Sequence, residues 1–313
     1  MEKIKIHCLT NPVTMQDVAN ILLAAGGSPI MGQDPEEAEE IARLCQAVLL
    51  NTGVPDERKF QACILAGKTA NMLGHPVVLD PVGAGASVFR EKGLRKLLQE
   101  VHPDVIRCNA EEAWTLYRWK TESTGFTEFQ GKMWTESRIS SGGVDSSFSP
   151  DEEVQIQLAL ALSSAYGCTA LVSGKMDVVS DGVRIQALTG GSGKASKITG
   201  TGCMLSALCV LFSVKEKSFF EGTAKAAELW KKARKRQKKK QPGLAEALAP
   251  AVSCSLIFWK PSVGKRRKAD EDGSKTAPHL CGDRQKLVKA WGDFRAGSGR
   301  ASKSGGYLCP AAG

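Results

Sequence analysis

Short apolar runs alternate with longer amphipathic stretches along this chain, from its start to about Val214, and this rhythm limits the folds open to it. The apolar runs are short and partly β-branched, which is typical of buried strands, and the stretches between them have helical length and period. Strands alternating with helices predict right-handed βαβ crossovers. We therefore expect an α/β fold with a mostly parallel central sheet and helices on both faces. The clearest predicted strands are Ala47–Leu50, Pro76–Asp80, Asp104–Arg107 and Thr169–Ser173.

Capping residues locate two helix starts. Asp34 offers a side-chain acceptor and Pro35 suits the first helical position, so a helix is predicted to begin there. Asn109 is a similar cap for a helix from Ala110 onward. Residues 116–142 are polar, with several aromatic residues and no clear period, and we predict a loop or insertion.

The charge of the chain is divided unevenly. The whole chain has a net charge of +9, but residues 229–313 hold 20 Lys and Arg against 6 Asp and Glu. That segment has a net charge of +14, which leaves −5 for residues 1–228. We therefore predict a folded domain at 1–228 and a basic, disordered tail of little periodicity at 229–313.

Membrane insertion, export and zinc binding find little support in the sequence. The first residues, MEKIKIHCLT, lack the apolar region of a secretory signal, and the apolar stretch Met204–Phe212 is too short to span a bilayer. The ten cysteines include no CxxC pair, and there are only four histidines. We expect reduced thiols and a cytoplasmic protein.

Two of the predicted strands end in charged side chains. In a parallel α/β sheet, ligands bind beyond the carboxyl ends of the strands. Asp80, followed by a glycine-rich stretch to Ala86, suits magnesium and phosphate, although an ordinary turn with an Asp cap is the commoner explanation for such a motif on its own. Arg107 offers a planar donor to phosphate oxygens and Glu112 follows in the first turn of the next helix, although a surface ion pair is the commoner outcome.

Two further segments combine hydroxyl groups with glycine. Ser173 precedes Gly174 at a strand end and could contact a nucleotide phosphate, whereas Asp181-Gly182 predicts a hairpin turn. The segment Thr199–Leu208 places glycines directly before an apolar helix, where free N–H groups and the helix dipole form an anion site. The same field favours a Cys203 thiolate, which could accept a proton from a substrate hydroxyl. A buried cysteine beside a tight turn is the alternative.

Five motifs, in this order over roughly residues 5–228, resemble the hydroxyethylthiazole kinase family, a branch of the ribokinase-like fold. They are His7–Met15 with Ala25–Met31, DPVGAGA at 80–86 with Phe89-Arg90, Arg107-x-Asn109-x-x-Glu112, Gly143–Ser146, and GTGC at 200–203. The resemblance implies ATP- and magnesium-dependent phosphorylation of 4-methyl-5-(2-hydroxyethyl)thiazole for thiamine synthesis or salvage. It also implies a homotrimer with its sites between subunits.

The resemblance also implies roles for individual residues. Cys203 stands where most ribokinase-like kinases carry the aspartate that acts as base. The implied substrate-binding residues are Met31, Gly200 and Asn11; the implied ATP contacts are Arg107, Ser173 and Asn11; and the implied metal-binding pair is Asp80 and Glu112.

The chain departs from the family pattern in three places. Cys108 stands where glycine is usual, so its side chain is expected to press on the nucleotide loop. The stretch 116–142 is longer than the family's connection. After Leu229 the resemblance fades into basic sequence, which suggests a shifted reading frame or a diverged tail.

Three other functions remain to be weighed. Lys231–Lys240 and Lys265–Lys268 could bind nucleic acid, but no aromatic residues interleave for base stacking, which does not favour this function. Another ribokinase-like enzyme, such as a hydroxymethylpyrimidine kinase or a nucleotide-repair dehydratase, usually has Asp at the position of Cys203. An inactive homologue is the third alternative, because of the altered C-terminal segment.

Overall fold

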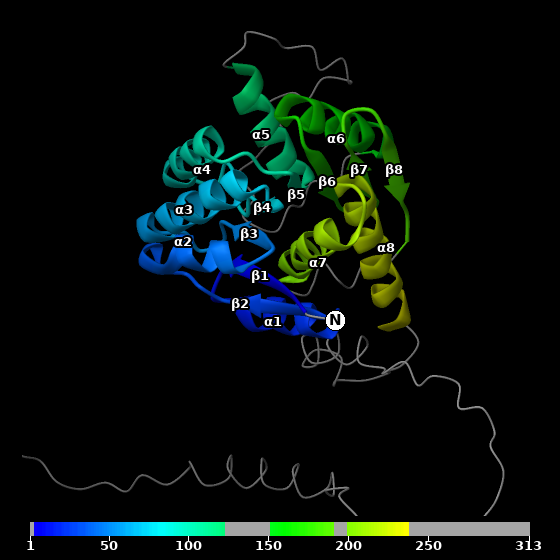
Figure 1. The fold of residues 1–313 in the computed structure, drawn as a ribbon. Helices are drawn as coiled ribbons and strands as arrows, with labels where there is room; N and C mark the ends of the chain where they lie inside the picture. The colour runs from blue at the N-terminus through cyan, green and yellow to red at the C-terminus, as the bar shows by residue number, and fades with distance from the viewer. Residues whose placement is uncertain (1–2, 123–150, 191–198, 238–313) are drawn as a thin grey trace, which may run out of the picture. The chain divides into compact units, whose positions relative to one another are not determined.

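One eight-stranded sheet organises the structure, a computed structural model that describes residues 3–122, 151–190 and 199–237 (Figure 1). The strands are ordered β2-β1-β3-β4-β5-β6-β7-β8. All neighbours from β2 to β6 pair in parallel, and β7 and β8 are antiparallel at one edge. The strands are β1 (Ile4–Leu9), β2 (Gly27–Ile30), β3 (Ala47–Asn51), β4 (Val77–Asp80), β5 (Val105–Asn109), β6 (Thr169–Ser173), β7 (Asp177–Ser180) and β8 (Ile185–Leu188).

Helices cover both faces of the sheet, as the sequence predicts (Figure 1). The helices are α1 (Met15–Ala24), α2 (Pro35–Leu44), α3 (Glu57–Leu73), α4 (Val88–Glu100), α5 (Ala110–Glu122), α6 (Glu152–Tyr166), α7 (Thr201–Lys215) and α8 (Phe219–Gln237). Buried side chains of α2 to α6 form one core with the sheet, and those of α1, α7 and α8 form a second. Val48 and Leu50 of β3 point into the first core while Ala47 and Leu49 point into the second, because successive strand residues face opposite sides.

The predicted caps and the predicted hairpin are present. The Asp34 carboxylate accepts a hydrogen bond from the Glu36 N–H at 3.0 Å, at the start of α2. Asn109 and Glu112 cap α5 reciprocally: the Glu112 N–H donates to Asn109 Oδ1 at 2.8 Å, and the Asn109 N–H donates to Glu112 Oε2 at 2.9 Å. Residues 181–184 form the turn between β7 and β8, where Gly182 has a φ of 90°.

Two predicted boundaries and one predicted contact were wrong. The stretch predicted as a loop from residue 116 begins inside α5, which continues to Glu122. The predicted domain end at residue 228 lies inside α8, whose Trp230 and Ala233 are buried. Lys231 is buried as well and pairs with Asp177 at 3.2 Å. Cys108 lies in the core with α5, on the face of β5 opposite Arg107, so the expected pressure on a nucleotide loop does not arise.

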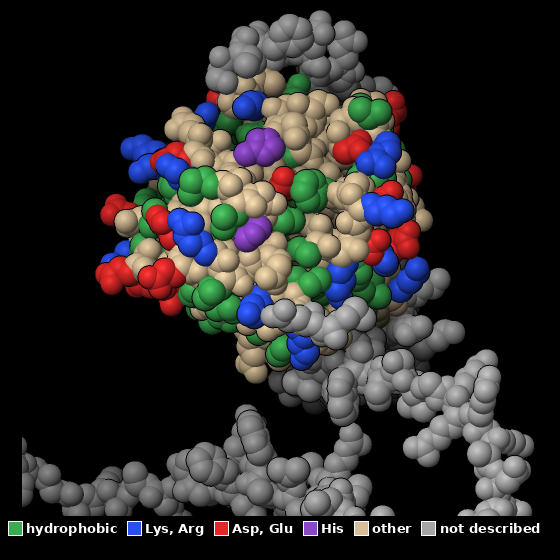
Figure 2. All heavy atoms as spheres, viewed as in Figure 1, with side chains coloured by type: hydrophobic (Ala, Val, Ile, Leu, Met, Phe, Trp, Pro, Cys, Tyr) green, Lys and Arg blue, Asp and Glu red, His purple; other side chains and the backbone are tan. Residues whose placement is uncertain are grey.

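The remaining expectations for those segments, including the Gly143–Ser146 motif and residues 238–313, lie outside the described residues. Within the described parts of the chain, no helix is both long enough and apolar enough to cross a membrane. On the face that Figure 2 shows, acidic and basic side chains are intermixed over α2, α3 and α4. Ion pairs on or beside these helices are Arg58–Asp34, Lys68–Glu100 and Arg95–Glu91.

Candidate active site

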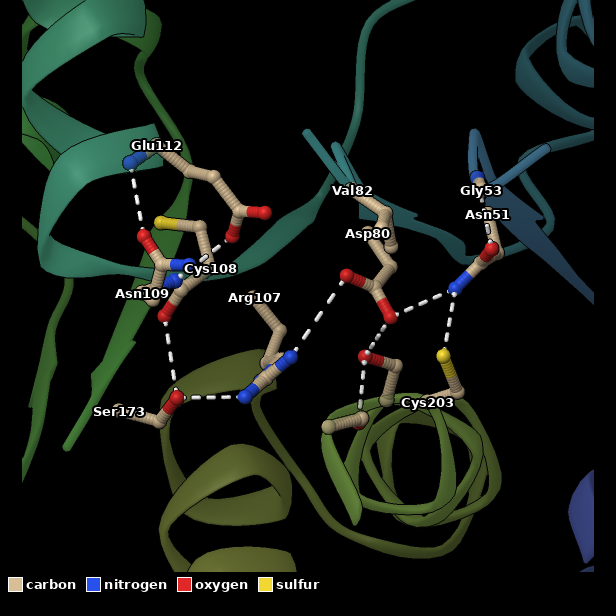
Figure 3. Close-up of polar contacts among 12 residues, drawn as sticks. Asn51, Gly53, Asp80, Val82, Arg107, Cys108, Asn109, Glu112, Ser173 and Cys203 are labelled. Carbon is tan, nitrogen blue, oxygen red and sulfur yellow. Dashed lines mark hydrogen bonds and ion pairs between the residues drawn. The ribbon is translucent and has the colours of Figure 1, made fainter. Parts of the chain in front are cut away.

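Parallel strands bring several polar residues to one edge of the sheet. Asn51 and Asp80 are register partners at the carboxyl ends of β3 and β4, and Asn109 and Ser173 are partners at the ends of β5 and β6. The first turn of α7 lies at the same edge, so that Cys203 faces Asn51 and Asp80 (Figure 3). Residues that are distant in sequence therefore form one polar site.

Asp80 lies at the centre of this site and is completely buried. Its Oδ2 accepts hydrogen bonds from Asn51 Nδ2 and from Ser206 Oγ, each at 2.8 Å. Its Oδ1 has no hydrogen-bond partner, and the nearest cation is Arg107, whose Nη1 lies 3.6 Å away. Burial raises the pKa of Asp80, and Arg107 and the two hydrogen bonds oppose that shift. A buried carboxylate oxygen without a donor is a ready ligand for a cation.

Arg107 connects Asp80 with the strand on the other side. Its Nη2 donates to Ser173 Oγ at 2.5 Å, and the Ser173 hydroxyl donates to the Cys108 carbonyl at 3.2 Å (Figure 3). The guanidinium packs against the first turn of α7, because a Cβ on Gly202 would lie 2.3 Å from Nη1. A cation beside a helix N-terminus is favourable once an anion joins them. The arrangement suits a phosphate group.

Glu112 is buried on the other side of Asp80. Its Oε1 accepts from the Gly83 N–H at 2.9 Å and its Oε2 accepts from Asn109, so the side chain ties the 80–86 loop to α5. Burial, together with repulsion from Asp80, raises the pKa of Glu112 to about 7. Two adjacent carboxyl groups that resist simultaneous ionisation would accommodate a divalent cation.

Cys203 lies in the first turn of α7 and is 7% exposed. Its sulfur accepts hydrogen bonds from Asn51 Nδ2 at 3.2 Å and from Asn11 Nδ2 at 3.5 Å. The expectation that the helix field favours a thiolate was wrong. Burial, with repulsion from Asp80, raises the pKa of Cys203, because a buried thiolate loses its hydration. The group is a neutral thiol at pH 7.

Gly200 begins α7 in a conformation that favours glycine. Its φ is 85°, and a Cβ there would lie 2.7 Å from Thr14 Cγ2. Thr14 follows the loop after β1, in which the Asn11 side chain also donates to Asn51 Oδ1 at 3.1 Å. Asn11 and Gly200 are thus both adjacent to Cys203.

Met31 is set apart from these residues. It follows β2, two strand positions away from β3 and so roughly 10 Å to the side. It is partly buried against the core that contains α7. The structure therefore brings together every predicted site residue except Met31, which lies at the same sheet edge on an outer strand.

Asn51 and Ser206 were not identified from the sequence. Asn51 contacts Asp80, Cys203, Asn11 and the Gly53 N–H, and Ser206 lies one helical turn after Cys203. The position of Asn51, a polar residue that ends an apolar strand, is the same signal that identified Asp80. Among the described residues, no group of three or more His, Cys, Asp and Glu side chains could hold a metal ion.

Comparisons with known proteins show which proteins the chain resembles. A family model described as "HK: Hydroxyethylthiazole kinase family" matches residues 2–252. A hydroxyethylthiazole kinase of Alkaliphilus oremlandii (strain OhILAs) is 37% identical over 270 residues, 85% of this chain and 92% of that protein. Its counterpart in Lysinibacillus sphaericus (strain C3-41) is 42% identical over 205 residues, 65% of this chain and 72% of that protein.

Solved structures extend the likeness to the fold. A hydroxyethylthiazole kinase protein from Pyrococcus horikoshii OT3 matches with a TM-score of 0.66 and 30% identity, over 82% of this chain and 88% of that one. A ribokinase-like superfamily protein from Enterococcus faecalis V583 matches with a TM-score of 0.52 over 81% of this chain and 87% of that one. At 11% identity, the second match concerns the fold alone.

Proposed function

Because the chain belongs to the hydroxyethylthiazole kinase family, we propose that it transfers a phosphoryl group from ATP to the hydroxyl of 4-methyl-5-(2-hydroxyethyl)thiazole. This places it in thiamine synthesis or salvage. The observation that carries the proposal is the Arg107 guanidinium, held between Asp80 and Ser173 against the first turn of α7. Phosphoryl transfer needs mainly positioning and charge neutralisation, which these groups supply.

Magnesium fits the donor set at this edge. Mg²⁺ is commonly held by one or two carboxylates together with substrate phosphates, so a cluster of three protein ligands is not required. Asp80 Oδ1, buried without a donor, suits a direct contact, whereas both Glu112 oxygens already accept N–H groups. We assign Asp80 as the ligand and Glu112 as the neighbouring negative charge. The ion supplies charge neutralisation at the β- and γ-phosphate oxygens.

Arg107 and Ser173 bind the nucleotide phosphates in this proposal. The Arg107 Nε has no hydrogen-bond partner, so the guanidinium has donor capacity left for an oxyanion. The N–H groups of the first turn of α7 face the same point and stabilise the negative charge that moves during transfer. Water is kept away by burial, since Asp80 is inaccessible and the Arg107 side chain is 12% exposed.

Cys203 orients the substrate hydroxyl in this proposal. Its thiol is neutral, and it is fixed by the amides of Asn51 and Asn11. A loose transition state leaves the hydroxyl proton in place until late, so the thiol needs only to accept a hydrogen bond from the hydroxyl, and the proton leaves with a phosphate oxygen. Gly200 packs against Thr14 directly before the helix turn that carries Cys203, and the Asn11 amide donates to the Cys203 sulfur. We retain Asn11 and Gly200 as substrate contacts.

Met31 is proposed to line the thiazole pocket, since its soft side chain suits a flat sulfur heterocycle. Its distance from Cys203 within one chain is consistent with a homotrimer whose sites lie between neighbouring subunits, which we also propose. Light scattering of the purified protein would test the trimer. Fractionation of the source cells would test a cytoplasmic location.

A substrate panel tests the proposed function. The purified chain is incubated with ATP, Mg²⁺ and either the thiazole alcohol, hydroxymethylpyrimidine or pyridoxal, and phosphorus NMR follows the product. The expected result is the thiazole phosphate alone, and only with Mg²⁺ present. A preference for either other alcohol, or ATP hydrolysis without phosphorylation of any alcohol, would contradict the proposal.

A further inference from the structure

Lys59, near the start of α3, is a buried cation outside the site residues considered so far. Its side chain is 8% exposed, and its Nζ donates to the Thr10 carbonyl at 2.9 Å and the Gly53 carbonyl at 2.6 Å. Within the described residues, no carboxylate lies within ion-pairing distance of this ammonium. Burial lowers the pKa of Lys59, because removing the ammonium group from water costs free energy.

The two carbonyl groups that Lys59 contacts belong to two loops of the candidate active site. Thr10 directly precedes Asn11 after β1, and Gly53 lies two residues after Asn51 at the end of β3. The amides of Asn11 and Asn51 are the two groups that donate to Cys203 Sγ. Lys59 therefore connects the backbones that carry both hydrogen-bond donors to the thiol.

The loop after β3 needs this support because its conformation is strained. Val54 has a φ of 48°, which a β-branched residue rarely adopts. Such a conformation persists only where the surroundings fix it. Lys59 holds the Gly53 carbonyl, the Gly53 N–H donates to Asn51 Oδ1 at 3.0 Å, and Arg90 Nη1 donates to the Thr52 carbonyl at 3.2 Å.

We propose that Lys59 is a positioning residue for the phosphoryl transfer. Its ammonium fixes the loops after β1 and β3, so that Asn11 and Asn51 hold Cys203 in register with Asp80. A neutral side chain of similar length would fill the same space without the two carbonyl contacts, and both loops would then sample other conformations. This proposal rests on the proposed function, because the reaction provides one of its two readouts.

The test compares Lys59→Met with Lys68→Met. Lys68 lies on the same helix, but it is exposed and pairs with Glu100 at the surface. In Lys59→Met we expect kcat to fall by about 10- to 100-fold, because misplaced groups lose orientation, with the KM for ATP changed by less than about threefold. Lys68→Met should match the wild type. A Lys59→Met protein with lower thermal stability but unchanged kcat would overturn the proposal.

Hydrogen exchange provides the readout that does not need activity. The Gly53 N–H donates to Asn51 Oδ1, and the Thr14 N–H donates to Asn11 Oδ1 at 3.2 Å. Both amides should exchange about tenfold faster in Lys59→Met than in Lys68→Met. Unchanged exchange would overturn the positioning role, whereas a wild type without thiazole turnover but with this exchange pattern would overturn only the proposed reaction.

Lys59→Arg provides a second test of the positioning role if Lys59→Met does not fold. The guanidinium keeps the positive charge and offers several N–H donors to the same carbonyls, although its three-carbon stem is shorter than that of lysine. The proposal requires that any fall in kcat be accompanied by faster exchange at Gly53 and Thr14. A change in one readout without the other would overturn it.

Discussion

Gly202→Ala tests whether the position of the Arg107 guanidinium matters for phosphate binding as well as for the stability of the fold. Gly202 lies in the first turn of α7, and its Cβ would lie 2.3 Å from Arg107 Nη1 and 2.9 Å from Arg107 Cζ. The helix itself would accept alanine, which is favoured over glycine by about 1 kcal/mol inside a helix. The guanidinium, however, would have to leave its position between Asp80 and Ser173.

The size of the effect follows from the contacts that Arg107 would lose. A hydrogen bond to a charged group contributes about 1.5–3 kcal/mol, and the gain in helix propensity offsets part of this loss. We therefore expect Gly202→Ala to be destabilised by about 1–2 kcal/mol, or a Tm lowered by roughly 2–8 °C. If the displaced guanidinium also loses a hydrogen bond of about 1.5–3 kcal/mol to the phosphates, kcat/KM for ATP falls by about 10- to 150-fold.

Gly222→Ala is the matched control. Gly222 lies in α8, and its Cβ would lie 2.6 Å from the Phe212 backbone oxygen, which cannot move aside. Phe212 is ten residues after Gly202 on α7, so the clash is about 15 Å from the site. This variant should lose stability at least as strongly and keep its kcat/KM. Calorimetry and steady-state kinetics measure both, and wild-type kcat/KM in Gly202→Ala would refute the reasoning.

Three other substitutions have distinct expected outcomes. Burial lowers the pKa of His7 from 6.5 to about 4, so stability is present above pH 6.5 and falls by about 3 kcal/mol as the pH drops to 4; urea unfolding of His7→Gln should show a smaller fall. Asp80→Asn should lower kcat/KM by at least about 100-fold and also lower Tm, since Arg107 loses its buried carboxylate partner; unchanged turnover in a Mg²⁺ titration would count against Asp80 as the metal ligand. Cys203→Ser should reduce kcat by about 10- to 100-fold if the Cys203 thiol orients the substrate hydroxyl for transfer; an unchanged rate would leave it a pocket-lining residue.

The predicted part of the site follows from one geometric rule. Asp80, Arg107 and Ser173 are at or near the ends of separate apolar strands, and parallel strands bring their carboxyl ends to one edge. The glycines before α7 led to the prediction of an anion site there. Asn51 obeys the same rule and was missed because an amide at a strand end also fits an ordinary turn.

The basic composition after Leu229 misled the prediction of the domain boundary. Lys231 was counted with the positive run, but in α8 it pairs with Asp177, which lies 54 residues earlier in the chain. The family match to residue 252 likewise passes the predicted boundary. A charge count along the chain cannot register a partner that only folding brings near.

The sequence by itself determined the alternation of strands and helices, the parallel sheet and most of the residues at its functional edge. These depend on local periodicity, capping and glycine placement, which neighbouring residues set. Tertiary structure alone decided that Cys203 is a neutral thiol, that Asp80 keeps an oxygen without a donor, and that Lys59 joins two loops. Loss of hydration and hydrogen bonding depend on distances through space, and packing sets those distances.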